Sequence, residues 1–415
     1  MPATPPLTDL RHAEALDRAD PLAAYRAEFL GAEGPLVYFD GNSLGRPLAR
    51  TSRRLAEFVE QDWGGRLIRG WDERWFDQPL TLGDALGRVV LGAGPGQTAV
   101  GDSTTVLLYK LARAAVDVQL ARDPRRTELV VDTDNFPTDR YLAEGIAGER
   151  GLSLRWIEVD RTAGVTAGQL ADVLGPATGL VLLSHVAYRS GFIADAPGLT
   201  RMAHEAGAMV LWDLSHSVGS VPLALDDWGA DLAVGCTYKY LNGGPGSPAF
   251  GYVAARLQPA LTQPIPGWMG HAEPFTMGPG YAPAAGMRRF LSGTPPIVGM
   301  VAMQDMLTLI EAAGMPAIRE KSLALTDYAL ALADAWLAPL DVEVASPRDP
   351  SVRGGHVTLR HAAMQEVTSR LWARDVIPDY RDPGGLRVGL SPLSTSFTEL
   401  WQGMGAVRDE LARLR

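Results

Sequence analysis

The sequence predicts an α/β fold with a mostly parallel sheet, followed by a smaller α+β unit. Two observations lead to this prediction. Short apolar runs alternate with amphipathic helical stretches in the middle of the chain, and this texture changes after a proline- and glycine-rich stretch at 264–299. The length of 415 residues also exceeds that of a usual single domain. We therefore expect a large domain and a smaller companion.

The expected strands of the large domain are apolar runs with little internal alternation, which is typical of strands buried on both faces. They lie at 128–132, 179–184, 208–213, 230–236 and 249–254. Helical patterns lie between several of them, at 104–121, 138–150, 168–174 and 197–206. This order predicts one doubly wound domain over residues 60–295.

The smaller α+β domain is expected over residues 296–415. Pro295 and Pro296 mark its beginning, because proline fixes φ and disfavours helix in the residue before it. Two helical segments, at about 297–312 and 316–338, lead into candidate strands at 340–345, 355–360 and 385–390. Residues 1–59 are expected to pack largely with this domain.

Composition excludes several classes of function. The formal net charge of −10 argues against a non-specific nucleic-acid or anionic-membrane binder, since either needs a basic field. Cys236 is the only cysteine, so an intramolecular disulfide and a multi-cysteine metal site are excluded, and we expect no metal. We find neither an apolar segment of signal-peptide length at the N-terminus nor an apolar run of membrane-span length, and expect a cytoplasmic protein.

Lysine is scarce in this chain, with only Lys110, Lys239 and Lys321 among 38 lysines and arginines. Lysine, unlike arginine, readily loses its proton and attacks a carbonyl. Lys239 follows an expected buried strand, stands between two tyrosines and precedes the glycine-rich stretch 243–246. It is therefore the candidate nucleophile. Lys110 falls inside an expected helix and ranks second, with a solvated or salt-bridged role as the ordinary explanation.

Asp213 ends a neighbouring expected strand. Ligands of open α/β sheets bind outside the carboxyl ends of the strands, so Asp213 and Lys239 could face one ligand. A pyridoxal-phosphate site needs a lysine to form the imine, a carboxylate to keep the pyridine nitrogen protonated and a ring or apolar face against the heterocycle. The structural alternatives are that Asp213 caps a turn, that Lys239 is a turn lysine and that His216, a candidate donor to the cofactor, is a core or capping histidine.

A candidate phosphate site lies where Ser103, Thr104 and Thr105 begin an expected helix. Hydroxyls and free backbone N–H groups at a helix N-terminus bind phosphate well, although an ordinary N-cap explains the same residues. The glycine-rich stretch 91–98 is not a competing site. It lacks the Gly-Lys-Ser/Thr ending of a P-loop, and we expect a loop there.

A candidate ring-binding segment, Asn-Phe-Pro-Thr-Asp at 135–139, follows another expected strand. Phe136 could stack on a heterocycle, and Asp139 could approach its nitrogen. A structural explanation is also open, because Pro137 suits the first position of the following helix.

Taken together, these segments resemble the kynureninase family of fold-type-I (aspartate-aminotransferase-like) pyridoxal-phosphate enzymes. WDLSHS at 212–217 with YKYLNGGPG at 238–246 is the most specific match. The other matching segments run through most of the chain and are YFDGNSLGRPL at 38–48, DSTTV at 102–106, NFPTD at 135–139, GWMGH at 267–271, FLSGTPPI at 290–297 and LRVGLSPL at 386–393.

The resemblance implies a role for each matching residue. Lys239 would form the internal aldimine, Asp213 would pair with the pyridinium nitrogen with Asp139 nearby, and Phe136 would stack on the ring. The remaining cofactor contacts would be Thr104, Thr105, Pro137, Thr138, Ser184, His216 and Tyr238, with Trp268 and Thr294 reaching the phosphate across a dimer interface. Substrate would be bound by Arg387, Ser43 and Trp71, with Arg387 as the bidentate partner of the substrate carboxylate.

The implied reaction hydrolyses the Cβ–Cγ bond of L-kynurenine, in tryptophan catabolism, to give anthranilate and L-alanine. Lys239 would move the Cα proton, and Tyr238 is the candidate acid for the final protonation. The family is a homodimer with shared active sites. Thr294 and Trp71 stand where animal members have asparagine and histidine, and both favour L-kynurenine over 3-hydroxykynurenine as the hypothesis.

Two alternatives remain at this stage. A desulfurase-like lyase of the same fold needs a nucleophilic cysteine on a loop well beyond the lysine, whereas Cys236 ends a buried strand. A non-catalytic protein could keep the fold for binding, although every expected cofactor residue is present.

Overall fold

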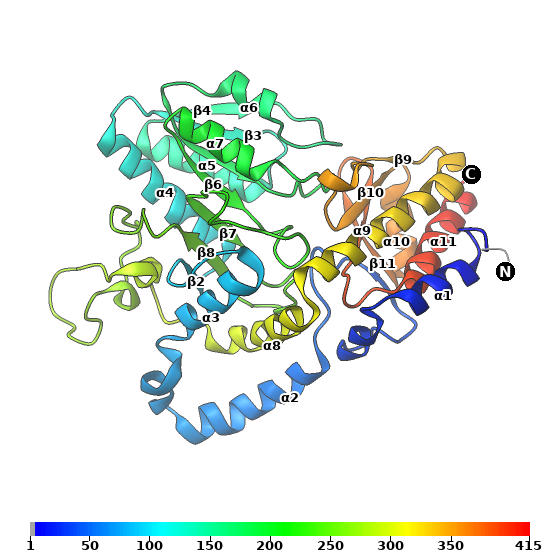
Figure 1. The fold of residues 1–415 in the computed structure, drawn as a ribbon, viewed down its shortest axis with the longest axis horizontal. Helices are drawn as coiled ribbons and strands as arrows, with labels where there is room; N and C mark the ends of the chain where they lie inside the picture. Colours follow the sequence, from blue (N-terminus) through cyan, green and yellow to red (C-terminus); the bar gives the residue numbers. More distant parts are fainter. Residues whose placement is uncertain (1–4) are drawn as a thin grey trace.

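The computed structural model describes residues 5–415, which form two sheets with separate buried clusters of apolar side chains (Figure 1). The seven-stranded sheet has the order β2-β8-β7-β6-β5-β3-β4. Its strands are β2 (Thr98–Gly101), β3 (Glu128–Asp132), β4 (Ser153–Ile157), β5 (Thr178–Ser184), β6 (Met209–Asp213), β7 (Leu232–Gly235) and β8 (Ala249–Val253). Strand β8 runs antiparallel to both of its neighbours, β2 and β7, and the other six strands share one direction and end at one edge of the sheet.

Helices cover both faces of this sheet. The pair α4 (Thr104–Arg122) and α5 (Pro137–Arg150) packs together, as does the pair α6 (Ala167–Val173) and α7 (Ala196–Glu205). The chain crosses the sheet toward β4 through α4 and α5, and it returns toward β6 through α6 and α7. Because crossovers between parallel strands are right-handed, this reversal places the two helix pairs on opposite faces of the sheet. Helices α3 (Gln78–Leu86) and α8 (Ile297–Ala313) complete the large unit.

The five-stranded sheet has the order β1-β11-β12-β10-β9 and joins the two ends of the chain. Its strands are β1 (Val37–Phe39), β9 (Glu343–Val344), β10 (His356–Arg360), β11 (Val376–Arg381) and β12 (Gly385–Gly389). The helices around it are α1 (Leu10–Ala19), α9 (Met315–Leu332), α10 (Met364–Trp372) and α11 (Phe397–Arg413), with α1 beside α11 (Figure 1). Strand β1 pairs in parallel with β11, which ties this N-terminal strand to the small sheet.

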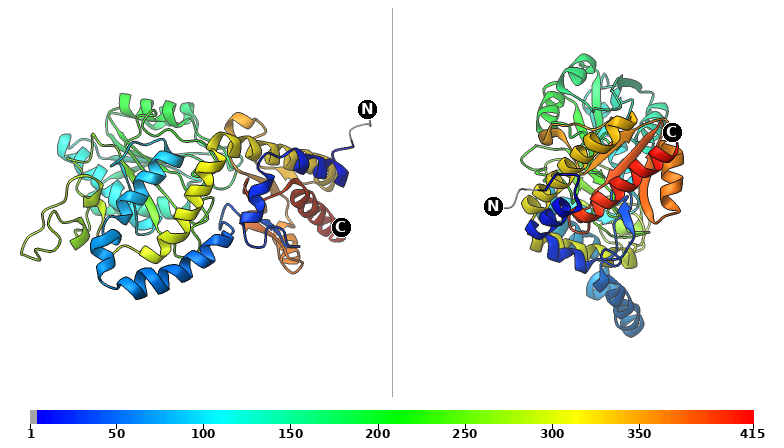
Figure 2. Two further views of the ribbon diagram at one scale, coloured as in Figure 1. Left: turned by 60° about the horizontal axis from the view of Figure 1, so that its bottom comes forward. Right: turned by 90° about the vertical axis from the view of Figure 1, so that its right-hand side faces the viewer.

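A helical arm projects from the body of the molecule after residue 48 (Figure 2). It starts as α2 (Ala49–Glu57), which packs on α8, and continues as a π-helical segment, Phe58–Gly64. A second such segment, Trp71–Trp75, leads back to α3. Several large apolar side chains on the arm face solvent in the single chain, among them Val59, Trp63, Leu67 and Ile68.

The predicted α/β class with a smaller α+β unit is confirmed, and the five strands expected in the large domain are β3, β5, β6, β7 and β8. Strands β2 and β4 were not expected. β4 is an edge strand whose side chains alternate between exposed and half-buried, and β2 has only four residues next to a glycine-rich loop. The expected strand at 340–345 is too long, since β9 spans two residues and a 3-10 turn precedes it.

The proposed domain limits, 1–59, 60–295 and 296–415, stay predictions. Buried side chains of α8, and Ile318 at the start of α9, belong to the large-sheet cluster, whereas α9 from Leu325 onward belongs to the small-sheet cluster. The change of core therefore falls within α9 and favours a later boundary than 295/296.

One helical stretch, Met315–Leu340, is long and apolar enough to cross a membrane by length and composition, a candidate that the search for uninterrupted apolar runs overlooked. It begins with α9, whose Leu325, Ala329 and Leu332 are fully buried in the small-sheet cluster. Core helices of soluble proteins satisfy the same criterion, so this feature is weak evidence for a membrane span.

Candidate active site

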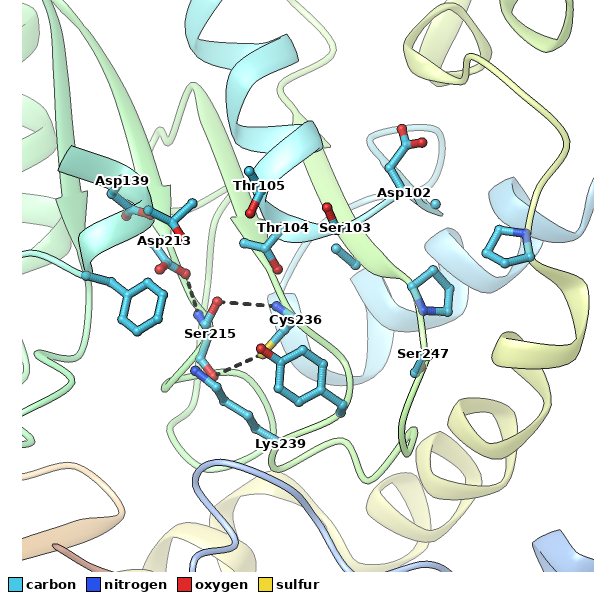
Figure 3. A pocket seen from close by; sticks show the side chains of 18 of the residues that line it. Asp102, Ser103, Thr104, Thr105, Asp139, Asp213, Ser215, Cys236, Lys239 and Ser247 are labelled. Carbon is cyan, nitrogen blue, oxygen red and sulfur yellow. Dashed lines mark hydrogen bonds between the residues drawn. The ribbon is translucent and has the colours of Figure 1, made fainter. Parts of the chain in front are cut away.

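A cavity of about 600 Å³ opens where the parallel strands of the large sheet end (Figure 3). Each strand from β2 to β7, apart from the edge strand β4, delivers polar residues to this edge, because all of them point the same way. The lining includes eleven of the residues expected from the sequence: Thr104, Thr105, Phe136, Thr138, Asp139, Ser184, Asp213, His216, Tyr238, Lys239 and Thr294.

Lys239 lies in the turn after β7 and is 9% exposed. Its Nζ is 3.0 Å from Nε2 of His216 and 5.9 Å from the centroid of the Phe136 ring. Burial, and then the charge of Lys239, hold the pKa of His216 well below its usual value. A neutral His216 can accept a hydrogen bond from Lys239 Nζ through Nε2, and its buried Nδ1 has no partner among residues 5–415.

Asp213 and Asp139 form the acidic end of the cavity (Figure 3). The Asp213 carboxylate accepts the backbone N–H of Ser215 at 2.7 Å. Burial, and then the charge of Asp213, raise the pKa of Asp139 well above its usual value. Asp139 therefore holds its proton more tightly than a free carboxyl does. Its Oδ2 is buried and has no partner within the described chain, so a polar group of a ligand would satisfy it.

The opposite end of the cavity is the N-terminus of α4. Ser103 caps the helix by accepting the N–H of Val106 at 3.4 Å, and Thr104 and Thr105 line the cavity beside it. The positive end of the helix dipole and the free N–H groups of the first turn favour an anion here.

Lys110 lies beneath the cavity surface at this end, where it joins two segments of the wall. Its side chain is fully buried, and its Nζ lies 2.5 Å from Asp102 and 3.1 Å from the carbonyl of Phe290. Of the two ordinary roles considered for it, the salt-bridged one is correct. The ion pair fixes the loop before α4 and the start of the segment 290–296, which carries Thr294 into the cavity.

Arg387 lies on β12 of the small sheet and is 1% exposed. Its guanidinium donates to the carboxylate of Asp379, to Ser43 Oγ at 2.9 Å and to the carbonyl of Tyr188 at 2.7 Å. Tyr188 lines the cavity, so Arg387 lies directly behind the wall between the two sheets. Asp379 was not expected, because no local motif marks it and it meets Arg387 only through pairing of β11 with β12.

Five expected residues do not line the cavity of the single chain: Arg387 and Ser43 lie behind its wall, and Pro137, Trp71 and Trp268 lie elsewhere. Pro137 begins α5. Trp71 packs edge-on against Trp75 at 5.7 Å, and Trp268 is 39% exposed and packs against Phe275 at 6.0 Å. Sequence reasoning missed other cavity residues, among them Val186 and Tyr188 in the loop after β5, which carries no motif. The segment 290–297 was recognised as a matching motif, but only Thr294 in it was given a role.

No group of three or more metal-ligating side chains occurs within residues 5–415. The cavity therefore offers carboxylates, hydroxyls, a lysine and a helix N-terminus as its chemistry.

Comparison with known proteins decides the family. Residues 318–407 match the model of the kynureninase C-terminal domain, and residues 112–362 match the model of the class-V aminotransferases. A kynureninase of Pseudomonas fluorescens is 41% identical over 403 residues, which is 96% of this chain and 94% of that protein. The chain belongs to the kynureninase family.

Solved structures share the fold at low sequence identity. A cysteine desulfurase from Thermococcus onnurineus NA1 has a TM-score of 0.79 at 17% identity and covers 94% of this chain and 98% of its own. A C-DES variant with glycine covalently linked to its pyridoxal-phosphate cofactor has a TM-score of 0.80 at 18% identity, over 92% and 99% of the two chains. At such identities these structures support the fold-type-I architecture alone.

The residues of the cavity fit pyridoxal phosphate. Lys239 is a buried amine that can bond to an aldehyde, and the α4 N-terminus offers donors for a phosphate. Asp213 and the unpartnered Oδ2 of Asp139 lie at the acidic end of the cavity, where a protonated ring nitrogen would fit. Phe136 offers a face for the ring. Kynureninase family membership implies the same cofactor.

Proposed function

We propose that this kynureninase-family chain hydrolyses the Cβ–Cγ bond of L-kynurenine to anthranilate and L-alanine with pyridoxal phosphate as its cofactor. The observation that carries the proposal is the meeting of Lys239, Asp213 and the N-terminus of α4 around one cavity, in a chain 41% identical to a kynureninase over 96% of its length. When bound, the cofactor supplies an electron sink for negative charge developing at Cα and Cβ of the amino acid.

Lys239 would hold the cofactor covalently and then act on the Cα proton of the substrate. The contact with neutral His216 at 3.0 Å supports this role, because His216 Nε2 can orient the amine and share its proton. Asp213 would keep the ring nitrogen protonated. The raised pKa of Asp139 beside it favours the protonated form, which would add a hydrogen-bond donor without a second negative charge.

Arg387 would bind the substrate carboxylate. Its guanidinium is ordered by Asp379, Ser43 and the carbonyl of Tyr188 and is 1% exposed in the single chain, so the substrate carboxylate would have to replace at least one of these partners. The planar guanidinium suits a bidentate pair with a carboxylate, which a lysine would not reproduce.

Tyr238 is the proposed acid for the last protonation, at Cβ. It lines the cavity, and burial raises the pKa of its hydroxyl above the usual value. The hydroxyl therefore keeps its proton at neutral pH and can donate it to a carbanion. Replacing Tyr238 by Phe tests this role, which predicts slow product formation at saturating cofactor, where the loss of a cofactor contact no longer limits turnover.

The proposed preference is for L-kynurenine over 3-hydroxykynurenine. Thr294, which lines the cavity, supports it, since a threonine offers less room or no partner for an added hydroxyl. Trp71 does not line the cavity of the single chain, so its part in the preference rests on the resemblance alone. The comparison of kcat/KM for the two substrates decides the preference, and a higher value for the hydroxylated substrate would overturn it.

The proposed assembly is a homodimer with shared active sites in the cytoplasm. Exposed apolar side chains on the arm (Trp63, Leu67, Ile68) and on the 265–281 loop (Phe275, Met277) support a partner surface, because solvent-facing groups of this size mark interfaces. Trp268 lies on the same loop and would reach the phosphate of the partner's site. Sedimentation velocity tests the dimer, and a monomer at micromolar concentration would refute it.

The decisive experiment mixes the purified protein with pyridoxal phosphate, records the absorbance of the bound cofactor, and then follows anthranilate fluorescence after kynurenine is added. Borohydride reduction and peptide mass analysis should locate the cofactor on Lys239, and Lys239→Ala should abolish turnover. Absence of any bound cofactor would refute the enzyme proposal. Bound cofactor without anthranilate would favour another fold-type-I activity, such as a desulfurase-like lyase, or a non-catalytic binding protein.

A further inference from the structure

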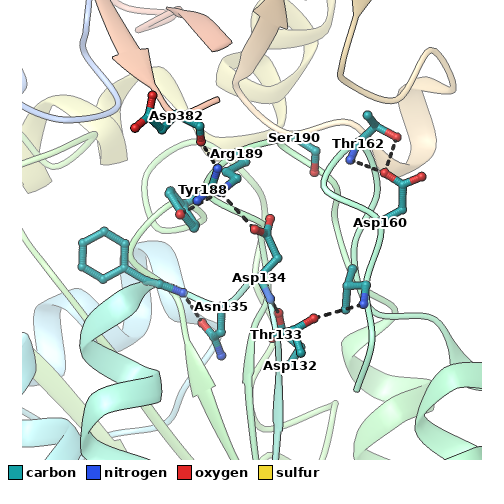
Figure 4. A network of polar contacts seen from close by, with 12 residues as sticks. Asp132, Thr133, Asp134, Asn135, Asp160, Thr162, Tyr188, Arg189, Ser190 and Asp382 are labelled. Carbon is teal, nitrogen blue, oxygen red and sulfur yellow. Dashed lines mark hydrogen bonds and ion pairs between the residues drawn. The ribbon is translucent and has the colours of Figure 1, made fainter. Parts of the chain in front are cut away.

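The loop that follows β5, residues 186–193, makes polar contacts with segments of both units near the cavity (Figure 4). It folds back on itself through a bridge between Val186 and Ile193. The N–H of Gly354 donates to the carbonyl of Gly191 at 2.7 Å, and the N–H of Ile193 donates to the carbonyl of Val352 at 2.8 Å. The loop therefore follows a strand of the large sheet along the chain, but its backbone is hydrogen-bonded to the segment that precedes β10 of the small sheet.

The backbone at the tip of this loop holds the Arg387 strand. The carbonyl of Tyr188 accepts from Arg387 Nη1 at 2.7 Å. The carbonyl of Arg189 accepts from His356 Nε2 at 3.2 Å and from the hydroxyl of Thr358. Thr358 stands opposite Arg387 in the pairing of β10 with β12. Any shift of the tip would therefore displace the partners of the guanidinium.

The side chain of Arg189 fixes the tip in place (Figure 4). Its Nε lies 3.0 Å from the carboxylate of Asp134 and donates to the hydroxyl of Tyr188 at 2.8 Å. Its Nη1 donates to the carbonyl of Asp382, in the turn between β11 and β12 of the small sheet. One guanidinium thus joins a loop of the large sheet, the loop tip and the small sheet. The side chains of Arg189 and Asp134 are only 21% and 10% exposed, so the ion pair is well shielded from water.

Asp134 leads directly to the ring-binding segment. Asn135 Oδ1 accepts from Ser184 Oγ at 2.8 Å and from the N–H of Phe136 at 2.7 Å, which fixes the start of α5. The Phe136 ring meets the Tyr188 ring edge-on at 5.4 Å, and Lys239 lies on its cavity side. The contacts of Arg189 therefore reach the ring side of the cavity through Asp134 and through Tyr188.

We propose that Arg189 is a positioning residue that keeps Arg387 on the small sheet in register with Phe136 on the large sheet. The proposal rests on the function proposed above, in which Arg387 binds the substrate carboxylate and Phe136 faces the cofactor ring. Arg189 contacts neither ligand and acts only through Asp134, Tyr188 and Asp382. Its role is thus to set the distance between the carboxylate site and the ring site.

The test compares Arg189→Met with Arg348→Met. Arg348 makes a bidentate pair with Asp334 in the small unit, away from the cavity, and serves as the matched control. Arg189→Met should raise KM for L-kynurenine about tenfold, change kcat less than threefold and reduce the visible circular dichroism of the bound cofactor. Arg189→Lys, which keeps the charge beside Asp134, should restore part of both signals. Asp134→Asn should alter the dichroism more than KM, because it loosens the ring side only.

A purely structural role would lower the melting temperature of Arg189→Met without changing KM or dichroism relative to Arg348→Met, and that result would overturn the proposal. If Arg189→Met does not fold, Arg189→Lys and Asp134→Asn decide the same question. If the wild-type protein binds the cofactor but does not cleave kynurenine, the proposed function fails by itself. The visible circular dichroism of the bound cofactor in the variants still tests the role of Arg189 in that case. Dichroism equal to that of the wild type would refute the positioning role.

Discussion

The buried ion pair between Lys110 and Asp102 can be broken from either side, by Lys110→Met or by Asp102→Asn. We predict that both variants lose stability, but that their affinities for pyridoxal phosphate change in opposite directions. Lys110 is fully buried, whereas 29% of the Asp102 side chain is exposed at the edge of the cavity, beside the N-terminus of α4. Lys110→Met removes the cation and leaves the carboxylate facing the proposed phosphate site. Asp102→Asn removes the anion and leaves the ammonium. Asparagine also tolerates the left-handed backbone of this position, where φ is +50°.

Both variants should be less stable than the wild type. Breaking a buried ion pair costs about 3–5 kcal/mol, and the partial exposure of Asp102 reduces this to about 2–3 kcal/mol. Unfolding entropy of about 2.1 cal/mol/K for each of 415 residues converts that loss into about 2–4 °C of melting temperature. Differential scanning calorimetry of the cofactor-free protein measures this shift.

Affinity for pyridoxal phosphate should move in opposite directions. A unit charge about 8–10 Å from an anion is worth about 1.5–2 kcal/mol at an effective dielectric constant of about 20, and partial exposure lowers this to about 1 kcal/mol. Cofactor binding should therefore weaken about fivefold in Lys110→Met and tighten in Asp102→Asn, as followed by absorbance titration. Turnover of Lys110→Met at saturating cofactor should remain. A change of affinity in the same direction in both variants would refute the electrostatic reasoning.

Two further predictions concern residues just outside the cavity lining. Burial, and then the nearby Asp134, raise the pKa of Asp132 to about 7, so the stability that its neutral form contributes is complete below about pH 4 and is lost as the pH rises to 7. Asp132→Asn should thus match the wild type at pH 4 and exceed it by about 1–3 kcal/mol at pH 8 in urea unfolding, whereas parallel pH curves would contradict this. Gly45→Ala should lower cofactor loading, because the new Cβ would lie 2.4 Å from the carbonyl oxygen of Lys239. Gly148→Ala, whose Cβ meets nothing within 4 Å, is the control, and equal loading of the two variants would count against this contact.

The large sheet was predictable because its signal is local. Strands β3, β5, β6 and β7 are apolar runs buried on both faces, and their burial is nearly complete in the structure. Parallel strands end at one edge, so Asp213 and Lys239 could be expected to meet from their places after β6 and β7. Strand β4 escaped prediction because an edge strand buries little, and an alternating run such as SLRWI carries a weak signal.

The sequence by itself therefore determined the fold class, the family and the group of residues at the strand ends, since each depends on short motifs and on strand direction. Only the tertiary structure decided that Lys110 is buried against Asp102, that His216 contacts Lys239 and that Arg387 lies behind Tyr188. These contacts join segments whose spacing along the chain carries no signal, such as the 344 positions between Ser43 and Arg387. They form only when the small sheet packs beside the large one, and that packing depends on the shapes of both cores at once.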